Sequence, residues 1–262
     1  MTPEVMSFQV STRAAAAAGD LIWRATEEGL IGHDPYEGKV LATAEVADVI
    51  AIAGCDEMLT VGTRSGEVLG LEPSTGRQMF SLFADTSNRL VGAKDAVWLF
   101  QGDTRTASRV TLSGGLGLAV TVGSASHFVV VGEELWWVEE QMTVRSSRGH
   151  RIDLELPLGP SGAISCSGAV WFGADRYLMH VSVWSSKVGR PLPSPIGVPI
   201  VLACAGGRVI GADQSRVIVM DPAADASVVE VDASLGGPPV AAAGVTNAAW
   251  VVSEHDALLL TF

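Results

Sequence analysis

Gly19-Asp20-Leu21-Ile22-Trp23 is the clearest copy of a pattern that recurs along this chain: a small residue, a polar turn, an aliphatic approach and a bulky residue. The bulky position is filled seven times, at intervals of 36, 39, 38, 35, 39 and 40 residues. A repeat of about 40 residues built only of short strands is typical of a β-propeller blade. The sequence therefore predicts an all-β fold, a seven-bladed β-propeller, from the column Trp23, Leu59, Trp98, Trp136, Trp171, Ile210 and Trp250.

Each blade is expected to be a four-stranded antiparallel sheet, and the last copy supplies only three strands. A fourth strand is available at the other end of the chain, where residues 5–10 alternate apolar and polar side chains. Its pairing with the last copy would close the ring and remove two open sheet edges. We predict one domain, residues 1–262, with blades at 12–46, 47–83, 84–122, 123–159, 160–197, 198–236, and 237–262 together with strand 5–10.

The tryptophan column falls on the second strand of each copy. We expect these rings to pack between neighbouring blades, where each can bury about 150–250 Å². Stacking on a cofactor is the alternative, but seven equivalent positions indicate seven equivalent packing problems.

A tight turn follows the third strand and begins with an acid and a proline in three copies. The acid-proline pairs are Asp34-Pro35, Glu72-Pro73 and Asp221-Pro222, and the first two turns close on Gly38 and Gly76. In such a turn the carboxylate accepts backbone N–H groups, proline presets φ, and glycine adopts a positive φ.

With these turns and two further segments, the chain resembles the superfamily of PQQ-like, YncE-like and streptogramin B lyase-like propellers. The segments are Leu135-Trp136-Trp137-Val138-Glu139 and Gly168-Ala169-Val170-Trp171-Phe172, which look like the lyase blade motif of an aromatic pair followed shortly by Glu. The resemblance implies a propeller architecture over the whole chain, and only blade four keeps the motif's glutamate, at Glu139. The matching positions in blades one, five and seven are Thr26, Ala174 and Ser253, and the closing Trp of the quinoprotein signature is absent.

The composition of the chain limits the kinds of partner that it can bind. Charged residues make up only 18% of the chain, below the roughly 25% of typical globular proteins, so most side chains are expected between packed layers. The net charge of −12 argues against nucleic acid or an anionic membrane as partner, because both require a basic surface. The N-terminus lacks the pattern of a cleaved signal, and the apolar runs are only of strand length.

The three cysteines are widely spaced and form no Cys-x-x-Cys pattern. We therefore expect Cys55, Cys166 and Cys204 to be unpaired, buried thiols, in a protein located in a reducing cytoplasm.

Antiparallel strands place the loops between second and third strands on one rim, together with the crossovers between blades. This rim gathers acids, arginines and two histidines around the predicted channel mouth, where propellers usually bind ligands. The other three histidines, His33, His150 and His180, fall on third strands or the opposite rim, and we expect them to be structural or solvated. The rim residues include Asp85, Asp103, Glu140, Asp175, Asp213 and Arg216, besides the candidates named next.

The candidate site combines proton-transfer groups with cations that could hold a substrate. His255 lies between Glu254 and Asp256, so it is a candidate general base, and the alternative is a solvated loop. His127 and Glu139 share a blade and could meet at the channel mouth. The predicted catalytic residues are His127, Glu139, Glu254 and His255, and the predicted substrate-binding residues are Arg64, Arg89, Arg105, Arg176 and Tyr177.

The leading hypothesis from sequence is a propeller that binds a small-molecule ligand or substrate, with lyase or cyclase chemistry as its activity. We expect no organic cofactor, and no phosphate-binding loop is present. The absence of a Gly-x-Ser-x-Gly elbow argues against acyl-hydrolase chemistry. No compact metal-ligand motif occurs either, but a divalent metal held across blades stays an open alternative. The competing hypothesis is a noncatalytic scaffold that presents its charged rim to a protein partner, and a deep apolar mouth with a buried His–Glu pair would favour the enzyme.

Overall fold

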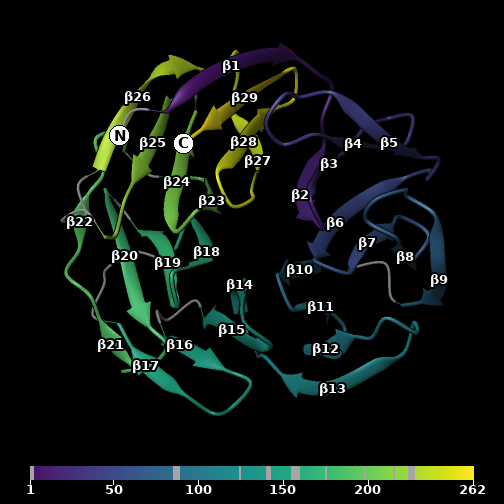
Figure 1. The fold of residues 1–262 in the computed structure, drawn as a ribbon. Helices are drawn as coiled ribbons and strands as arrows, with labels where there is room; N and C mark the ends of the chain where they lie inside the picture. The colour runs from purple at the N-terminus through teal and green to yellow at the C-terminus, as the bar shows by residue number, and fades with distance from the viewer. Residues whose placement is uncertain are drawn as a thin grey trace. The chain divides into compact units, whose positions relative to one another are not determined.

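The computed structural model describes residues 3–84, 89–123, 125–139, 143–154, 160–174, 176–197, 199–214, 216–223 and 228–262. Within these ranges every regular element is a β-strand, and the strands form seven antiparallel sheets of at least four strands (Figure 1). The predicted class, an all-β seven-bladed β-propeller, is confirmed. The described residues include no helix that could span a membrane.

Residues 11–124 form one compact unit of three sheets. Each sheet is a meander in which the strands pair in sequence order. The strands are β2 (Ala14–Ala18), β3 (Leu21–Ala25), β4 (Leu30–His33) and β5 (Val40–Ala44); β6 (Val49–Cys55), β7 (Met58–Thr63), β8 (Glu67–Leu71) and β9 (Gln78–Phe83); β10 (Arg89–Ala93), β11 (Ala96–Gln101), β12 (Thr106–Val110) and β13 (Leu116–Thr121).

Residues 1–10 and 125–262 form the second unit, with four sheets. In its second sheet two short strands, β21 and β22, share the outer edge of β20. The strands are β14 (Ala125–Val131), β15 (Glu134–Glu139), β16 (Thr143–Ser146) and β17 (Arg151–Asp153); β18 (Gly162–Cys166), β19 (Ala169–Ala174), β20 (Tyr177–Ser182), β21 (Lys187–Val188) and β22 (Leu192–Pro193); β23 (Val201–Ala205), β24 (Arg208–Asp213), β25 (Arg216–Met220) and β26 (Val228–Ser234); β27 (Pro239–Gly244), β28 (Ala248–Ser253), β29 (Asp256–Thr261) and β1 (Glu4–Gln9).

The N-terminal strand completes the last sheet, as predicted. β1 pairs antiparallel with β29, from Glu4 opposite Thr261 to Gln9 opposite Asp256. Phe8 stacks on the Trp250 ring with centroids 5.6 Å apart and an interplanar angle of 6°. The alternating pattern of residues 5–10 thus gives β1 both a backbone partner and an aromatic contact.

First strands of successive sheets pack closely, which explains their small side chains. Within residues 11–124, β6 contacts both β2 and β10. A Cβ atom added at Gly54 would overlap the carbonyl oxygen of Ala17, and one added at Gly92 would overlap that of Gly54. Backbone therefore lies directly against backbone at these positions, and only glycine fits.

The tryptophan column packs between neighbouring sheets, as expected. Trp23 is fully buried in a hydrophobic cluster with residues of β7 and β8, the next sheet along the chain. Its Nε1 donates to the carbonyl oxygen of Pro73 at 3.0 Å, and a Cβ at Gly76 would lie 3.1 Å from the ring. The acid-proline turn of one sheet therefore accepts the ring N–H of the sheet before it. Trp136 and Trp171 lie in similar clusters, each shared by two successive sheets.

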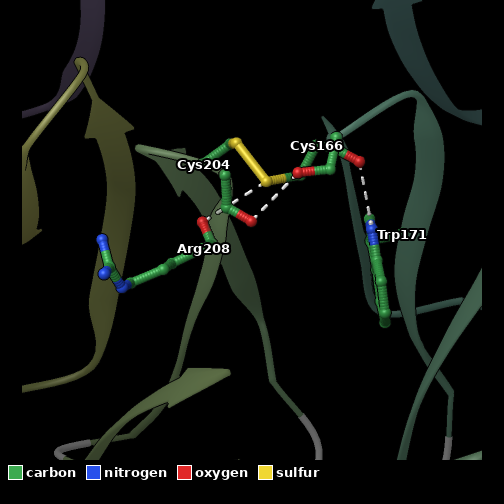
Figure 2. Close-up of a disulfide and its surroundings, with 6 residues drawn as sticks. Cys166, Trp171, Cys204 and Arg208 are labelled. Carbon is green, nitrogen blue, oxygen red and sulfur yellow. Dashed lines mark hydrogen bonds between the residues drawn. A yellow bond between two sulfur atoms is a disulfide. The ribbon is translucent and has the colours of Figure 1, made fainter. Parts of the chain in front are cut away.

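The expectation of three unpaired thiols is wrong for two of them. Cys166 on β18 and Cys204 on β23 form a disulfide between adjacent first strands, with Cα atoms 5.5 Å apart (Figure 2). The two cysteines are 38 residues apart, which is one repeat, so they occupy neighbouring positions on adjacent strands within disulfide range. Cys55 is free and buried, as expected. The disulfide also removes the argument from thiols for a reducing compartment.

The disulfide predicts a measurable loss of stability on reduction. Cross-linking residues 38 apart should stabilise the fold by about 4 kcal/mol through the entropy of the unfolded chain. Dithiothreitol should therefore lower the melting temperature of the wild-type chain and leave that of Cys166→Ala/Cys204→Ala unchanged.

The thiol count gives an independent check. Unfolded, unreduced protein should show one reactive thiol, from Cys55, and reduced protein should show three. The disulfide would be contradicted by three reactive thiols in unreduced protein, or by the same wild-type melting temperature with and without dithiothreitol.

Candidate functional site

Three of the predicted substrate-binding residues lie in the 11–124 unit, and all three are exposed. Arg64 lies in the turn between β7 and β8, and its backbone N–H donates to the Asp48 carbonyl oxygen at 2.9 Å. Arg105 lies in the turn between β11 and β12 with a φ of 50°, and Arg89 is the first residue of β10. The first two therefore occupy second-to-third strand connections, as the repeat predicts.

Arg176 and Tyr177 lie where β19 turns into β20, and both are exposed. The Arg176 carbonyl oxygen accepts the Ser194 N–H at 2.8 Å, and Tyr177 pairs with Pro193 of β22. These contacts involve backbone, so the side chains are left to solvent. The substrate-binding role of all five residues stays a prediction.

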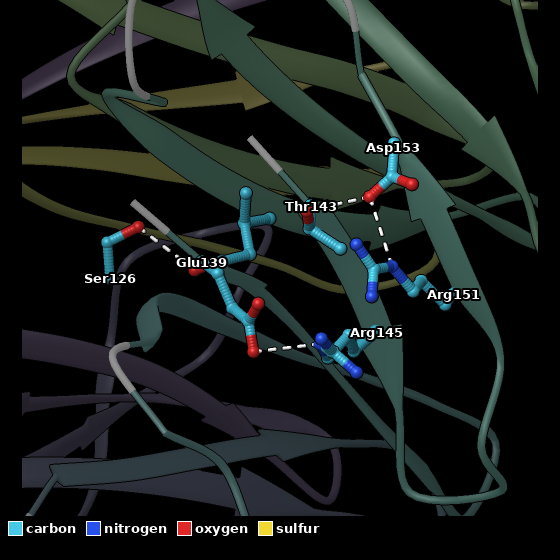
Figure 3. Close-up of polar contacts among 7 residues, drawn as sticks. Ser126, Glu139, Thr143, Arg145, Arg151 and Asp153 are labelled. Carbon is cyan, nitrogen blue, oxygen red and sulfur yellow. Dashed lines mark hydrogen bonds and ion pairs between the residues drawn. The ribbon is translucent and has the colours of Figure 1, made fainter. Parts of the chain in front are cut away.

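Glu139 pairs with an arginine rather than with His127. The carboxylate at the end of β15 lies 2.9 Å from Nε of Arg145 on β16, an ion pair without hydrogen-bond alignment at Nε (Figure 3). His127 Nδ1 lies 3.2 Å from Ser126 Oγ, which itself donates to the Val138 carbonyl oxygen. Arginine stays protonated in proteins, so Arg145 cannot take a proton from Glu139 or give one to it. The pair therefore orients the Glu139 carboxylate and is not a proton-transfer pair.

The same polar arrangement continues to the outer strand of this sheet. Asp153 on β17 accepts hydrogen bonds from Thr143 Oγ1 at 2.9 Å and Arg151 Nε at 3.2 Å (Figure 3). The bond from Thr143, followed by that from Arg151, lowers the pKa of Asp153. Asp153 therefore acts as an ionised partner that links β16 and β17.

Glu254 and His255 lie in a turn that the backbone organises. Ser253 Oγ accepts the N–H groups of His255 at 3.3 Å and Asp256 at 3.0 Å, and the His255 carbonyl oxygen accepts the Val10 N–H. Both candidate side chains are exposed. Among the described residues, the His255 ring has no hydrogen bond or ion pair, so its neighbouring carboxylates do not orient it.

Metal ligands do not gather in the part of the chain that the structure describes. No group of three His, Cys, Asp or Glu side chains there could hold an ion. Of the predicted rim residues, Asp85, Glu140 and Asp175 lie outside the described ranges. The expectation of no organic cofactor stays a prediction.

One buried charged group with several hydrogen bonds, Arg24, was not a sequence candidate. Arg24 on β3 is 5% exposed and donates from Nε to His33 Nε2 at 3.0 Å. Its Nη1 donates to Ser11 O at 3.0 Å and to Thr12 Oγ1 at 2.9 Å. The sequence does contain a signal, because Arg24 is the only charged residue directly after the bulky column position.

This arrangement determines the protonation state of His33. Because Arg24 Nε can only donate, Nε2 of His33 must accept, and Nδ1 donates to the Gly38 carbonyl oxygen at 2.9 Å. Burial lowers the pKa of His33, the bond to Gly38 opposes this, and the Arg24 charge lowers it further. Burial also lowers the pKa of Arg24. His33 is thus a neutral structural residue that holds Arg24, and Arg24 ties residues 11 and 12 to the first sheet.

His180 and His150 also have structural roles. The His180 ring lies 4.4 Å from the Trp171 ring, and burial lowers its pKa. The His150 ring stacks on Trp136 at 5.5 Å. The structural interpretation of His33 and His180 is confirmed, and His150 combines an exposed position with an aromatic contact.

Comparison with known proteins supports the fold. No protein-family model and no curated protein matches the chain. The crystal structure of BamB from Moraxella catarrhalis matches with a TM-score of 0.59 and 14% identity, over 96% of this chain and 85% of that one. A chain in a crystal structure of the Mitotic Checkpoint Complex matches with a TM-score of 0.75 and 8% identity, over 100% of this chain and 92% of that one. At these identities the likeness is one of fold alone.

The histidine environments predict a pH-dependent stability. The folded-state pKa values of His33 and His180 are depressed, so the unfolded chain binds these protons first on acidification. The stability that they contribute is present above the ordinary value of 6.5 and is lost as pH falls through the lower folded values. Urea unfolding should show a lower free energy of unfolding at pH 5.5 than at pH 7.5.

Variants assign this loss to its source. His33→Gln, with a side chain that can still accept from Arg24, should reduce the difference between the two pH values. His255→Gln, at an exposed position, should leave it unchanged. Equal pH slopes in wild type and His33→Gln would contradict the neutral, buried assignment.

Proposed function

We propose that this chain is a noncatalytic protein-interaction scaffold. The observation that carries the proposal is the exposure of large apolar side chains on the outermost strands of its sheets. Single exposed apolar residues are ordinary on protein surfaces, but extended exposed apolar surface is typical of interaction sites.

The outermost strands of the 11–124 unit show this best. Val40 and Leu41 on β5 are each 57% exposed, and Phe83 at the end of β9 is 81% exposed. Met79 on β9 and Leu116 on β13 are also exposed. An outermost strand has no neighbour on its far side within its sheet, so these residues are available to a partner.

The contacts of the acid–base candidates support the same proposal. Glu139 forms an ion pair with Arg145. The His255 ring has no hydrogen bond or ion pair with any residue that the structure describes. General acid–base catalysis needs a base held by a second group and aimed at a substrate. The structure of the Mitotic Checkpoint Complex, in which a similar propeller occurs, is by its title that of a complex. A scaffold function for this chain agrees with such a setting.

The test begins by nominating partners and ends with purified components. Cross-linking mass spectrometry on the tagged chain in its own cells would nominate partners, and isothermal titration with each purified partner would measure its affinity. We expect at least one micromolar or tighter complex. The quadruple variant His127→Gln/Glu139→Gln/Glu254→Gln/His255→Gln should bind within twofold of wild type.

A surface variant serves as the comparison. Leu41→Ser/Phe83→Ser, at exposed positions that should not disturb the core, tests the outermost strands with circular dichroism as the folding check. The scaffold proposal fails if no purified partner binds. It also fails if the chain converts a small molecule and this activity is lost in the quadruple variant but not in Leu41→Ser/Phe83→Ser.

A further inference from the structure

Trp184 is exposed, whereas every other tryptophan is buried. Its exposed fraction is 88%, and none of the other six tryptophans exceeds 5%. It lies outside the repeated column, in the turn of residues 183–186 that joins β20 to β21. We call this segment the Trp184 turn. Trp184 does not pack within a sheet. Tryptophan is strongly enriched among the residues that contribute most to binding at the centres of protein interfaces.

The fold holds this turn against a neighbouring hairpin. The Val183 N–H donates to the Gly168 carbonyl oxygen at 3.3 Å, and the Ser185 N–H donates to Ser182 Oγ at 3.4 Å. A Cβ at Gly168 would lie 2.7 Å from Trp184 Nε1, so the indole edge rests on the glycine backbone. The backbone of the turn is therefore anchored beside the indole, which reduces the backbone entropy lost on binding.

The stretch of sequence that contains this turn has a net positive charge, opposite in sign to the charge of the whole chain. Lys187 on β21 and Arg190 just after it are exposed, and neither forms an ion pair with any residue that the structure describes. Between Glu155 and Asp213 the sequence has four cationic residues and a single acid, Asp175, in a chain with a net charge of −12. Asp175 precedes β20, whereas Trp184 follows it.

The outer edge of this sheet is poorly suited to pairing with an added strand of a partner protein. β21 and β22 each pair only two residues with β20, and the segment between them contains Gly189, Arg190 and Pro191. Pro191 and Pro193 have no N–H to donate to an added strand. A partner would therefore be recognised through side chains, with the indole and the exposed Val188 as its apolar contacts.

We propose that the Trp184 turn, with Lys187 and Arg190, docks an acidic segment of a partner protein that carries an apolar side chain onto the indole. The inference rests on the proposed scaffold function and names the chemistry of one partner. Charge complementarity selects the occupant, because two unpaired cations beside an aromatic anchor favour carboxylates over a neutral or basic segment.

The test uses defined peptides as probes. Fluorescein-labelled 15-residue peptides, rich in Glu and Asp around a central Leu or Phe, would be titrated and followed by anisotropy. Each has a counterpart with Gln in place of every acid. The acidic peptide should bind at least tenfold more tightly than its Gln counterpart and should shift the emission of the exposed tryptophan to the blue.

Variants locate the binding. Trp184→Ala and Lys187→Glu/Arg190→Glu should each weaken binding at least tenfold, whereas Trp184→Phe should retain an intermediate affinity without the emission shift. The charge-matched control, Arg77→Glu/Lys94→Glu, reverses two exposed cations on the other unit and should change affinity less than twofold. All substituted side chains are exposed, and circular dichroism checks folding.

Four results would overturn the proposal. These are an absence of preference for the acidic peptides, wild-type affinity in the Trp184 turn variants, an equal loss in the control, or a dimer in sedimentation velocity that Trp184→Ala dissociates. The last would make the turn a contact between copies of this chain. If a purified partner binds the Trp184 turn variants as tightly as wild type, the scaffold function stands and this docking site alone fails.

Discussion

The close approach of neighbouring sheets is the constraint on which the rest of this structure depends. Backbone lies against backbone where Gly54 meets Ala17, and rings from the second strands fill the wider space farther out. The bond from Trp23 Nε1 to Pro73 O shows how the repeat meets both demands, because the turn of one sheet accepts the ring of another. The disulfide between β18 and β23 is a covalent form of the same approach.

Much of the fold could be predicted because its constraint repeats. A bulky residue about every 40 positions is enough to infer seven sheets, and the unpaired alternation of residues 5–10 identifies the strand that completes the last one. The structural roles of His33 and His180 also follow from their place on third strands. Each of these conclusions concerns a position that the repeat itself defines.

The rest depends on neighbours that a single sequence does not reveal. Cys166 and Cys204 appear unrelated until their spacing is recognised as one repeat on adjacent first strands. Glu139 could be placed at the end of β15, but its partner, Arg145, comes from the facing strand. Trp184 stands outside the column, and only the three-dimensional structure shows that its side chain is exposed. Buried Arg24 was missed because its partners are a histidine and the linker rather than an acid.

The proposed function depends on which side chains are used in packing and which remain exposed. Six tryptophans, three histidines and several acids have structural contacts, while exposed apolar groups lie on the outermost strands and in the Trp184 turn. Hydrogen–deuterium exchange of the chain with and without a purified partner tests this division most directly. The account predicts protection in the outermost strands or in residues 183–193 when the partner is bound. Protection confined to the β14–β15 sheet edge and the turn between β28 and β29 would contradict it and return the function to the predicted acid–base residues.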